Sequence, residues 1–363
     1  MNTRGTKRVE LRALTGFRFF AAIYVVWLHF APLKSGLTAT FISHGAVSVE
    51  FFFMLSGFIL TYVHDQSSDL DSQARRKFWI ARFARIYPVY GLAFLLFTPI
   101  IYANLVALHG HSAQTASRMT MYGIASFTLL QAWSPKLANA WNLPGWSLSA
   151  EAFFYACFPL VLVWLHRLPL RRVAYVGVLL WVIAFLPRLI ASAFPGKETA
   201  IGSLYEVVEY VPILRIAEFI GGMALARIFL MEAWVSHFAS RVLWLTLIAL
   251  LVTLLFCPSR YIGMLIFPEF ALLILGLSSS NGWLARIVGA QPLHLLGEAS
   301  YSIYILQTPV YFLYLRALVV SRGASGFGIF LTYQVLLVCV AMVTFKFVEK
   351  PANRSLRRAL LGE

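Results

Sequence analysis

Two polar residues that are costly to bury stand in the first apolar run of the chain, an arginine and a histidine. Arg18 and His29 lie eleven residues apart in the segment RFFAAIYVVWLH. Eleven residues make about three turns of an α-helix, so both side chains share one face and lie about 16 Å apart along the axis. A guanidinium binds anions, and an imidazole takes a proton from a hydroxyl or accepts an acyl group. The alternative is a snorkelling arginine beside a structurally bonded histidine.

Two carboxylates lie near the outer ends of later apolar runs. Glu50 belongs to GAVSVEFFFMLSGF and Glu151 to NLPGWSLSAEAFFY. Counting from the outer surface puts both at about the depth of His29, where a carboxylate would fix the imidazole tautomer. We therefore expect them near His29. The alternatives are a structural salt bridge for Glu50, and a helix cap by Ser147 or Ser149 with Glu151 in the first turn.

Two further pairs of charged residues have helical spacing. Arg82 and Arg85 in FWIARFARIYPVY share one helix face and form a candidate anion clamp, or an anchor for lipid headgroups. Arg215 and Glu218 in LRIAEFIGG are predicted to form an ion pair, and the two glycines that follow allow a close helix contact. No metal site is expected, because the loop histidines of the HGH sequence have no further ligands nearby.

The elements that position these residues must be membrane helices. The chain has 363 residues, of which 60% are hydrophobic and only 12% charged, about half the charged share of a soluble domain. We predict an all-α, polytopic membrane protein, with residues 1–363 as a single membrane-embedded domain. The expected spans are 14–33, 46–64, 86–107, 148–166, 173–193, 207–229, 241–257, 260–278, 300–319 and 327–347. A short polar run near 119–133 is expected to be re-entrant or interfacial.

The positive charge determines the orientation. The net charge is +15, from 30 Lys and Arg against 15 Asp and Glu. With ten spans, about two thirds of these cations fall on one side, which the positive-inside rule makes the cytoplasm. Both termini are then cytoplasmic. The basic residues are needed for topology and for contact with membrane lipids, so nucleic acid is not expected as a partner.

The charged residues form a gradient across the membrane. Arginines lie at the inner face, and the histidine and carboxylates are expected near the outer face. Acyl-CoA fits such a gradient, because it joins phosphates to a thioester through an arm of roughly 15–20 Å, comparable with the Arg18–His29 rise. The thioester would then reach His29. The alternatives are a transporter or flippase for a lipid-linked sugar or anionic metabolite, and a non-catalytic scaffold.

Seven segments in order resemble the acyltransferase 3 family, integral membrane enzymes that modify surface sugars. They are TGFRFFAAIYVVWLH, GAVSVEFFFMLSGF, FWIARFARIYPVY, WSLSAEAFFY, LRIAEFIGGMALA, LGEASYSIYILQTP and FVEKPANRSLRR. The resemblance implies transfer of an acyl group, most often acetyl, from cytoplasmic acyl-CoA to a carbohydrate or glycolipid hydroxyl at the bacterial inner membrane. It also implies the stand-alone form, without the extracytoplasmic hydrolase-like domain of some members.

Roles follow from the resemblance by matching position. His29 would be catalytic with Arg18 essential beside it, and Glu50 and Glu151 would belong to the same site. Arg82 and Arg85, together with Arg18, would contact CoA. The candidate substrate-binding residues are Trp146, Ser147, Ser149, Tyr304 and Gln307. Two departures matter: Glu50 replaces the usual Asp, and Gln307 stands where many relatives carry His, which leaves hydrogen bonding but not proton transfer.

Overall fold

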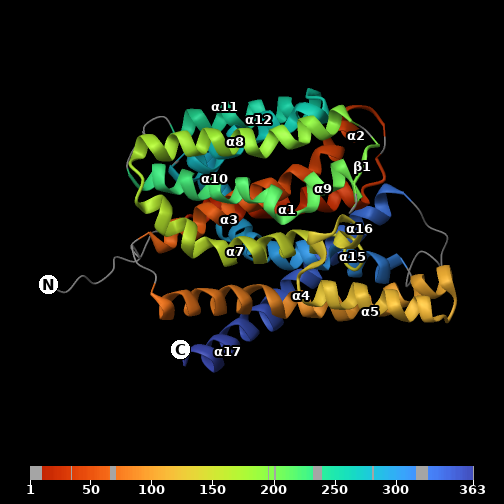
Figure 1. The fold of residues 1–363 in the computed structure, drawn as a ribbon. Helices are drawn as coiled ribbons and strands as arrows, with labels where there is room; N and C mark the ends of the chain where they lie inside the picture. Colours follow the sequence, from red (N-terminus) through yellow and green to blue (C-terminus); the bar gives the residue numbers. More distant parts are fainter. Residues whose placement is uncertain are drawn as a thin grey trace.

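The computed structural model is a bundle of helices, as predicted (Figure 1). It describes residues 10–362, apart from 34, 66–70, 195, 200, 201, 232–238, 280, 281 and 316–325. Within these residues the strands are limited to β1 and β2, a two-residue antiparallel pairing. The prediction of an all-α, polytopic membrane protein is therefore confirmed.

The bounds of the described elements are as follows. They are α1 (Arg12–Phe30), α2 (Gly36–Ser43), η1 (His44–Ala46), α3 (Val47–His64), α4 (Ser72–His109), α5 (Ala113–Phe127), η2 (Gln131–Trp133), α6 (Pro135–Ala138), α7 (Gly145–His166), α8 (Leu170–Ala193), β1 (Glu198–Thr199), β2 (Gly202–Ser203), α9 (Leu204–Tyr210), α10 (Pro212–Leu230), α11 (Ala239–Phe256), α12 (Ser259–Ser279), α13 (Trp283–Val288), α14 (Gln291–Glu298), α15 (Ser300–Tyr314), α16 (Phe327–Thr344), η5 (Phe345–Glu349) and α17 (Lys350–Leu361).

Eight of these segments are long and apolar enough to cross a membrane within the described part of the chain. They match eight of the ten expected spans. Helices also form at the other two places. However, α10 carries three charged residues, and the described part of α15 has only 15 residues, since the predicted end of that span lies outside the described residues. That α10 and α15 also cross the membrane stays a prediction.

The polar run near 119–133 forms α5 and η2 rather than a span. The preceding helix, α4, has 38 residues, a length of about 57 Å that exceeds the 30 Å core of a bilayer. The helix is followed by Gly110, which ends it with a φ of +63°, a conformation that suits a residue without Cβ. After this turn, α5 folds back along α4 (Figure 1). In η2, which follows, Gln131 and Ala132 are buried. A non-spanning segment at this place agrees with the expectation.

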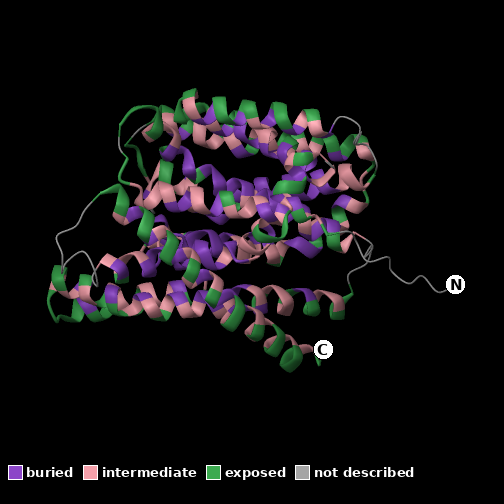
Figure 2. Cartoon of the chain, turned by 180° about the vertical axis from the view of Figure 1, so that it is seen from behind, coloured by how far each residue is buried: buried purple, intermediate pink, exposed green. Residues whose placement is uncertain are grey.

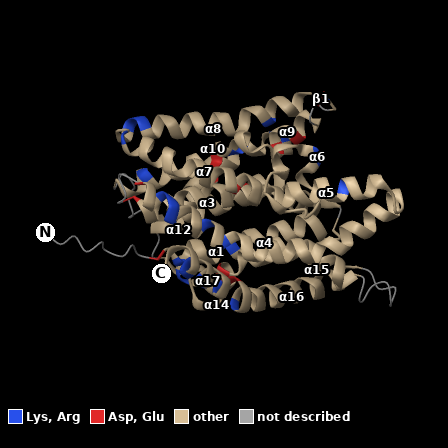
Figure 3. Ribbon diagram, turned by 60° about the horizontal axis from the view of Figure 1, so that its bottom comes forward, with Lys and Arg blue, Asp and Glu red and all other residues tan. Residues whose placement is uncertain are grey.

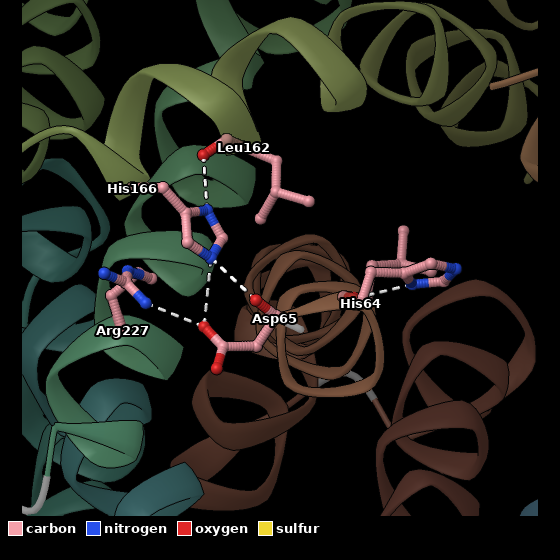
Figure 4. A network of polar contacts seen from close by, with 6 residues as sticks. His64, Asp65, Leu162, His166 and Arg227 are labelled. Atoms are coloured by element: carbon pink, nitrogen blue, oxygen red, sulfur yellow. Dashed lines mark hydrogen bonds and ion pairs between the residues drawn. The ribbon is translucent and has the colours of Figure 1, made fainter. Parts of the chain in front are cut away.

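The first described helix begins and the last one ends at the same end of the bundle (Figure 1). Lys and Arg residues gather at that end (Figure 3), and we call it the basic end. A cluster of polar contacts at this end joins Asp65, just after α3, to the neighbouring helices α7 and α10 (Figure 4). Asp65 accepts hydrogen bonds from Arg227 in α10 at 2.7 Å and from His166 at the end of α7 at 3.1 Å.

Buried residues concentrate in the middle of the bundle and exposed residues lie on its outside (Figure 2). Many of the exposed residues are large and apolar, as expected of a surface that faces lipid. At the centre, α3 and α10 pack closely. A Cβ on Gly222 would lie 1.9 Å from the carbonyl oxygen of Met54, and one on Gly57 would lie 2.0 Å from that of Phe219. This confirms the close helix contact predicted for the glycine pair of α10, because small residues let membrane helices approach each other.

Candidate active site

A cavity of about 180 Å³ lies between α1, α3, α4, α7 and α15, and we call it the inner cavity. Its polar wall contains three of the arginines and one of the carboxylates selected from the sequence. The residues are Arg18, Ser56, Arg82, Arg85, Ser147, Glu151, Tyr155, Ser300, Tyr301 and Tyr304. Apolar residues of α3 from Val49 to Leu60 form the remaining length of the wall, so the cavity extends about 16 Å along that helix.

The three arginines enter the inner cavity from the half of their helices nearer the basic end. Arg18 lies in the second turn of α1, and Arg82 and Arg85 lie in the first half of α4. Arg85 donates to Glu349, whose side chain is 1% exposed. Arg82 makes no ion pair among the described residues, and its Nε is buried without a hydrogen-bond partner. The cavity therefore presents an unpaired guanidinium, which favours an anionic ligand.

A break in the last long helix brings Glu349 to Arg85. Between α16 and α17, the backbone makes a π-helical turn at Phe345–Glu349, a rare feature often found at functional sites. The turn directs Glu349 into the bundle, where its Oε2 also accepts from Ser302 Oγ at 2.6 Å. Beside it, the Tyr301 hydroxyl donates to the carbonyl oxygen of Ile86 at 2.7 Å. These contacts fix the start of α15 against α4.

Glu151 lies among the arginines of the inner cavity rather than beside His29. Its Oε2 accepts a hydrogen bond of 3.2 Å from Tyr155, and the Tyr155 hydroxyl is also 3.2 Å from Ser56 Oγ. The expected contact with His29 is therefore not seen, since no hydrogen bond or ion pair joins Glu151 to His29 in the described part of the chain. The first six residues of α7 are buried, so counting residues from an assumed outer surface does not identify the neighbours of its first turns.

His29 stands beyond the inner cavity, with Gln307 as its partner. The two are joined by a 2.9 Å hydrogen bond between His29 Nδ1 and Gln307 Oε1. The Gln307 amide nitrogen donates to the Tyr304 carbonyl oxygen at 2.7 Å, which fixes the direction of the amide. The side-chain carbonyl oxygen of Gln307 can only accept a hydrogen bond, so the proton of this bond must lie on His29 Nδ1. In the neutral ring, Nε2 then has the free lone pair, and among the described residues it has no hydrogen-bond partner.

Glu50 is not the carboxylate partner of His29. It forms a buried ion pair with Arg188 of α8 instead, the structural salt bridge that the sequence left open as an alternative. An equal depth along the membrane normal suggested a contact, but depth says nothing about how each helix is rotated. Glu50 points from α3 toward α8, whereas His29 points from α1 toward α15.

The remaining candidates divide into two groups. Ser147 and Tyr304 line the inner cavity, with 2.9 Å between Ser147 Oγ and the Tyr304 hydroxyl. Trp146 lies outside it against Arg215, whose guanidinium carbon is 5.7 Å from the ring centre. Ser149 donates to the carbonyl oxygen of Leu129 at 2.6 Å and holds the preceding loop. Neither serine caps α7, which begins without a side-chain cap.

Residues 11–348 match the model of a family described as an acyltransferase domain. This chain belongs to the acyltransferase 3 family. The match covers nearly the whole chain and includes every predicted site residue. It agrees with a multi-pass membrane protein of acyltransferase type.

Named relatives support the family and differ in length. Acyltransferase MdmB of Streptomyces mycarofaciens is 30% identical over 313 residues, 82% of this chain and 78% of MdmB. Peptidoglycan O-acetyltransferase OatA of Listeria monocytogenes is 24% identical over 96% of this chain and 56% of OatA. The putative peptidoglycan O-acetyltransferase YrhL of Bacillus subtilis is 25% identical over 93% of this chain and 54% of YrhL. The chain thus spans a little more than half the length of OatA and YrhL. No solved structure matches it.

Several residues in or near the site of this acyltransferase 3 family member were missed by sequence reasoning. Tyr155 and Ser56 lie in segments already selected for Glu151 and Glu50, so the adjoining polar positions were a usable signal. Arg188 is an arginine inside an apolar run, which is by itself a functional candidate. Glu349 lies in the selected segment FVEKPANRSLRR, but residue spacing gives no sign of its place in the bundle, which depends on the π-helical turn at Phe345–Glu349.

Proposed function

We propose that this protein is a membrane O-acyltransferase of the bacterial plasma membrane. It takes an acyl group, with acetyl as the expected one, from cytoplasmic acyl-CoA. It transfers this group to a hydroxyl of an extracytoplasmic or lipid-linked carbohydrate. The relatives named O-acetyltransferases support the reaction class. The donor and the acceptor class are our inference from the site.

The shape and charge of the inner cavity are the observation that carries this proposal. The cavity is narrow and follows α3 for about 16 Å, close to the length expected for a pantetheine arm. Its arginines come from the halves of α1 and α4 nearer the basic end, which the positive-inside rule places in the cytoplasm. Arg18 and Arg82 supply positive charge for phosphate groups. In this arrangement the thioester extends away from the basic end.

His29 is the group proposed for the chemical step. Along α15, Tyr301 and Tyr304 line the cavity and Gln307 holds His29, so one helix face leads from the cavity to the imidazole. His29 Nε2 takes the proton of the acceptor hydroxyl, and the oxygen attacks the thioester carbonyl. The carbon–sulfur bond breaks, and the CoA thiolate leaves and is protonated. Acyl transfer through Nε2 itself requires the same free lone pair.

Loss of His29 tests the reaction directly. Purified protein in nanodiscs receives radiolabelled acetyl-CoA and surface glycans extracted from the source cells. We expect His29→Ala to lower the rate of label transfer about 100-fold or more, since general bases contribute at least that much. CoA binding should stay intact, because His29 does not line the inner cavity. CoA release and glycan labelling that are independent of His29 would contradict the proposal.

Loss of the arginine pair tests the donor site. We expect Arg82→Ala with Arg85→Ala to raise the KM for acetyl-CoA about tenfold or more, because Arg82 supplies a charge-assisted hydrogen bond of about 1.5–3 kcal/mol and Arg85 holds the cavity wall beside it. The matched control is Arg171→Ala with Arg172→Ala, a pair of exposed arginines at the start of α8. An unchanged KM in the α4 variant would remove both arginines from the donor site.

A further inference from the structure

A second cavity lies on the other side of α3 from the inner cavity, toward the end opposite the basic end. It has a volume of about 290 Å³ and is lined mainly by η1, α3, α8, α9 and α12; we call it the outer cavity. Its polar lining includes His44, Glu50, Arg188, Tyr205, Glu209 and Ser259. None of these residues lines the inner cavity, so the reaction proposed above does not account for them.

A buried ionic network reaches the outer cavity through Glu50, Arg188 and Glu209. Arg188 pairs with Glu50 and lies 3.3 Å from Glu209 and 3.9 Å from Glu218. Arg215 lies 3.2 Å from Glu209 and 3.1 Å from Glu218. Three carboxylates thus share two guanidiniums. Burying so many charges costs more than hydrophobic packing would, and charges inside membrane proteins generally mark ligand sites or water-filled cavities.

The network also retains unused hydrogen-bonding capacity. Glu218 Oε2 and Arg215 Nη2 are buried without a hydrogen-bond partner. Facing the network, His44 donates from Nδ1 to the Leu254 carbonyl oxygen at 2.9 Å, and its Nε2 is 3.1 Å from Ser259 Oγ. Arg260 adds a cation to the lining. The lining therefore offers carboxylate, hydroxyl and imidazole groups to a polar ligand. Arg260 is exposed, whereas the buried network has three carboxylates to two guanidiniums, and this negative balance disfavours an anionic ligand.

Consecutive residues of α3 contact the two cavities. Val49 lines the inner cavity and Glu50 the outer cavity, so one helix, about 10 Å across, separates them. A ligand unit in the outer cavity is therefore close to the end of the inner cavity farthest from the basic end. For the reaction proposed here, that is the end from which the acceptor enters.

We propose that the outer cavity is a subsite for one sugar ring of the acceptor, either neutral or bearing an amine. The proposal rests on the proposed function. The volume is near the lower end of small-molecule sites, about 300–1,000 Å³, and so suits a single ring. The carboxylates of the network accept hydrogen bonds from sugar hydroxyls or from an ammonium group. Tyr205, which is 58% exposed, offers an aromatic face at the rim.

The first experiment fills the outer cavity. A Cβ on Gly263 would lie 3.7 Å from Arg188 Nη1 and 3.7 Å from Phe185 Cβ, so Gly263→Leu places its larger side chain in the cavity. The matched control is Gly177→Leu, because a Cβ on Gly177 meets nothing within 4 Å. In cells, we expect Gly263→Leu to lower acylation of surface glycans at least tenfold. CoA affinity of the purified protein should stay unchanged, which also shows that the variant is folded.

The outcomes separate this proposal from the proposed function. No acylated glycan with the unchanged protein would mean that the proposed function fails. Full acylation with Gly263→Leu, beside an active parent, would overturn the subsite alone. If Gly263→Leu does not fold, Ser192→Leu replaces it, since Ser192 also lines the cavity, and the same two outcomes apply.

The second experiment tests the charge preference. Calorimetry compares three tetrasaccharides: N-acetylchitotetraose, which is neutral, chitosan tetramer, which is cationic, and tetragalacturonate, which is anionic. We expect the neutral or the cationic probe to bind at least tenfold more tightly than the anionic one, and Gly263→Leu to remove this difference. Preference for the anionic probe, or binding of none of the three, would contradict the proposal.

Discussion

Arg85 and Glu349 show how a charged residue is kept in the wall of a membrane-embedded cavity. Arg85 lines the inner cavity together with Arg18 and Arg82, but it alone among them has a carboxylate within ion-pair distance among the described residues. The two arginines of the RxxR segment therefore have different roles. Arg82 is available to an anionic ligand, whereas Arg85 is a wall residue positioned by Glu349 and supported by the aromatic ring of Tyr301, 6.0 Å away.

A double-mutant cycle tests this division. We expect Glu349→Ala to lower the melting temperature by about 2 °C or more and to be worse than the double variant Arg85→Ala with Glu349→Ala, because the single variant leaves a guanidinium without its partner. Ser302→Ala is the control, since it removes only one hydrogen bond to Glu349. Additive effects in thermal melts would mean that the two residues do not act as a pair.

The types of the site residues could be read from the sequence, but their partners could not. Helical spacing identified Arg82 with Arg85 and Arg215 with Glu218, because both spacings are local. The contact predicted between His29 and Glu50 needed the relative rotation of two helices, which residue counting does not contain. The same limit hid Arg188, which is the partner that Glu50 has in the structure.

The glycine contacts make α3 and α10 the rigid centre of the molecule. Gly57 and Gly222 each face a carbonyl oxygen of the other helix at a distance that leaves no room for Cβ. The position of α3 matters for both cavities, since Val49 and Glu50 lie on it. Close packing at the glycines thus fixes the wall that the two cavities share.

A methyl group at Gly57 tests the importance of this contact. A Cβ there would lie 2.0 Å from the Phe219 carbonyl oxygen, so Gly57→Ala must separate α3 from α10. We expect the apparent melting temperature in detergent to fall by more than about 3 °C. Gly91→Ala in α4 is the matched control, because its Cβ would meet nothing within 4 Å. Equal melting temperatures for the two variants would show that the contact is not needed.

At the level of elements, the length of the apolar runs predicted the membrane helices well. It did not predict where helices extend into polar sequence. Eight of the expected spans correspond to helices of suitable length, because twenty apolar residues have few alternatives to a membrane helix. The extension of α4 back to Ser72 was not predicted, since its first turns are polar. Asp71 explains this start, because its Oδ1 accepts from Ala74 N at 2.6 Å and caps the helix.

Orientation is a property of the whole molecule that follows from its distribution of charge. The structure brings the start of α1 and the end of α17 to one end, where Lys and Arg gather (Figure 3). Of the basic residues that indicated a cytoplasmic N-terminus, Arg4, Lys7 and Arg8 lie outside the described residues. A cytoplasmic position of both termini stays a prediction.

Labelling of single cysteines in intact cells tests this orientation. The native Cys157, Cys257 and Cys339 are first replaced by Ala. We expect a membrane-impermeant maleimide to label Gln114→Cys, at the start of α5, in intact cells. Ser355→Cys, in α17, should react only after permeabilisation. Both positions are exposed, so a reversed pattern would mean the opposite orientation.

The shared wall of α3 has a consequence for the order in which ligands bind. Since Val49 and Glu50 are neighbours on one helix, any shift of α3 that widens one cavity moves the wall of the other. Thermodynamic linkage then requires reciprocity: if a bound sugar changes the affinity for CoA by some factor, bound CoA changes the affinity for that sugar by the same factor. The affinity for CoA is measured with and without the sugar, and the affinity for the sugar with and without CoA. The two pairs of measurements should give the same coupling free energy.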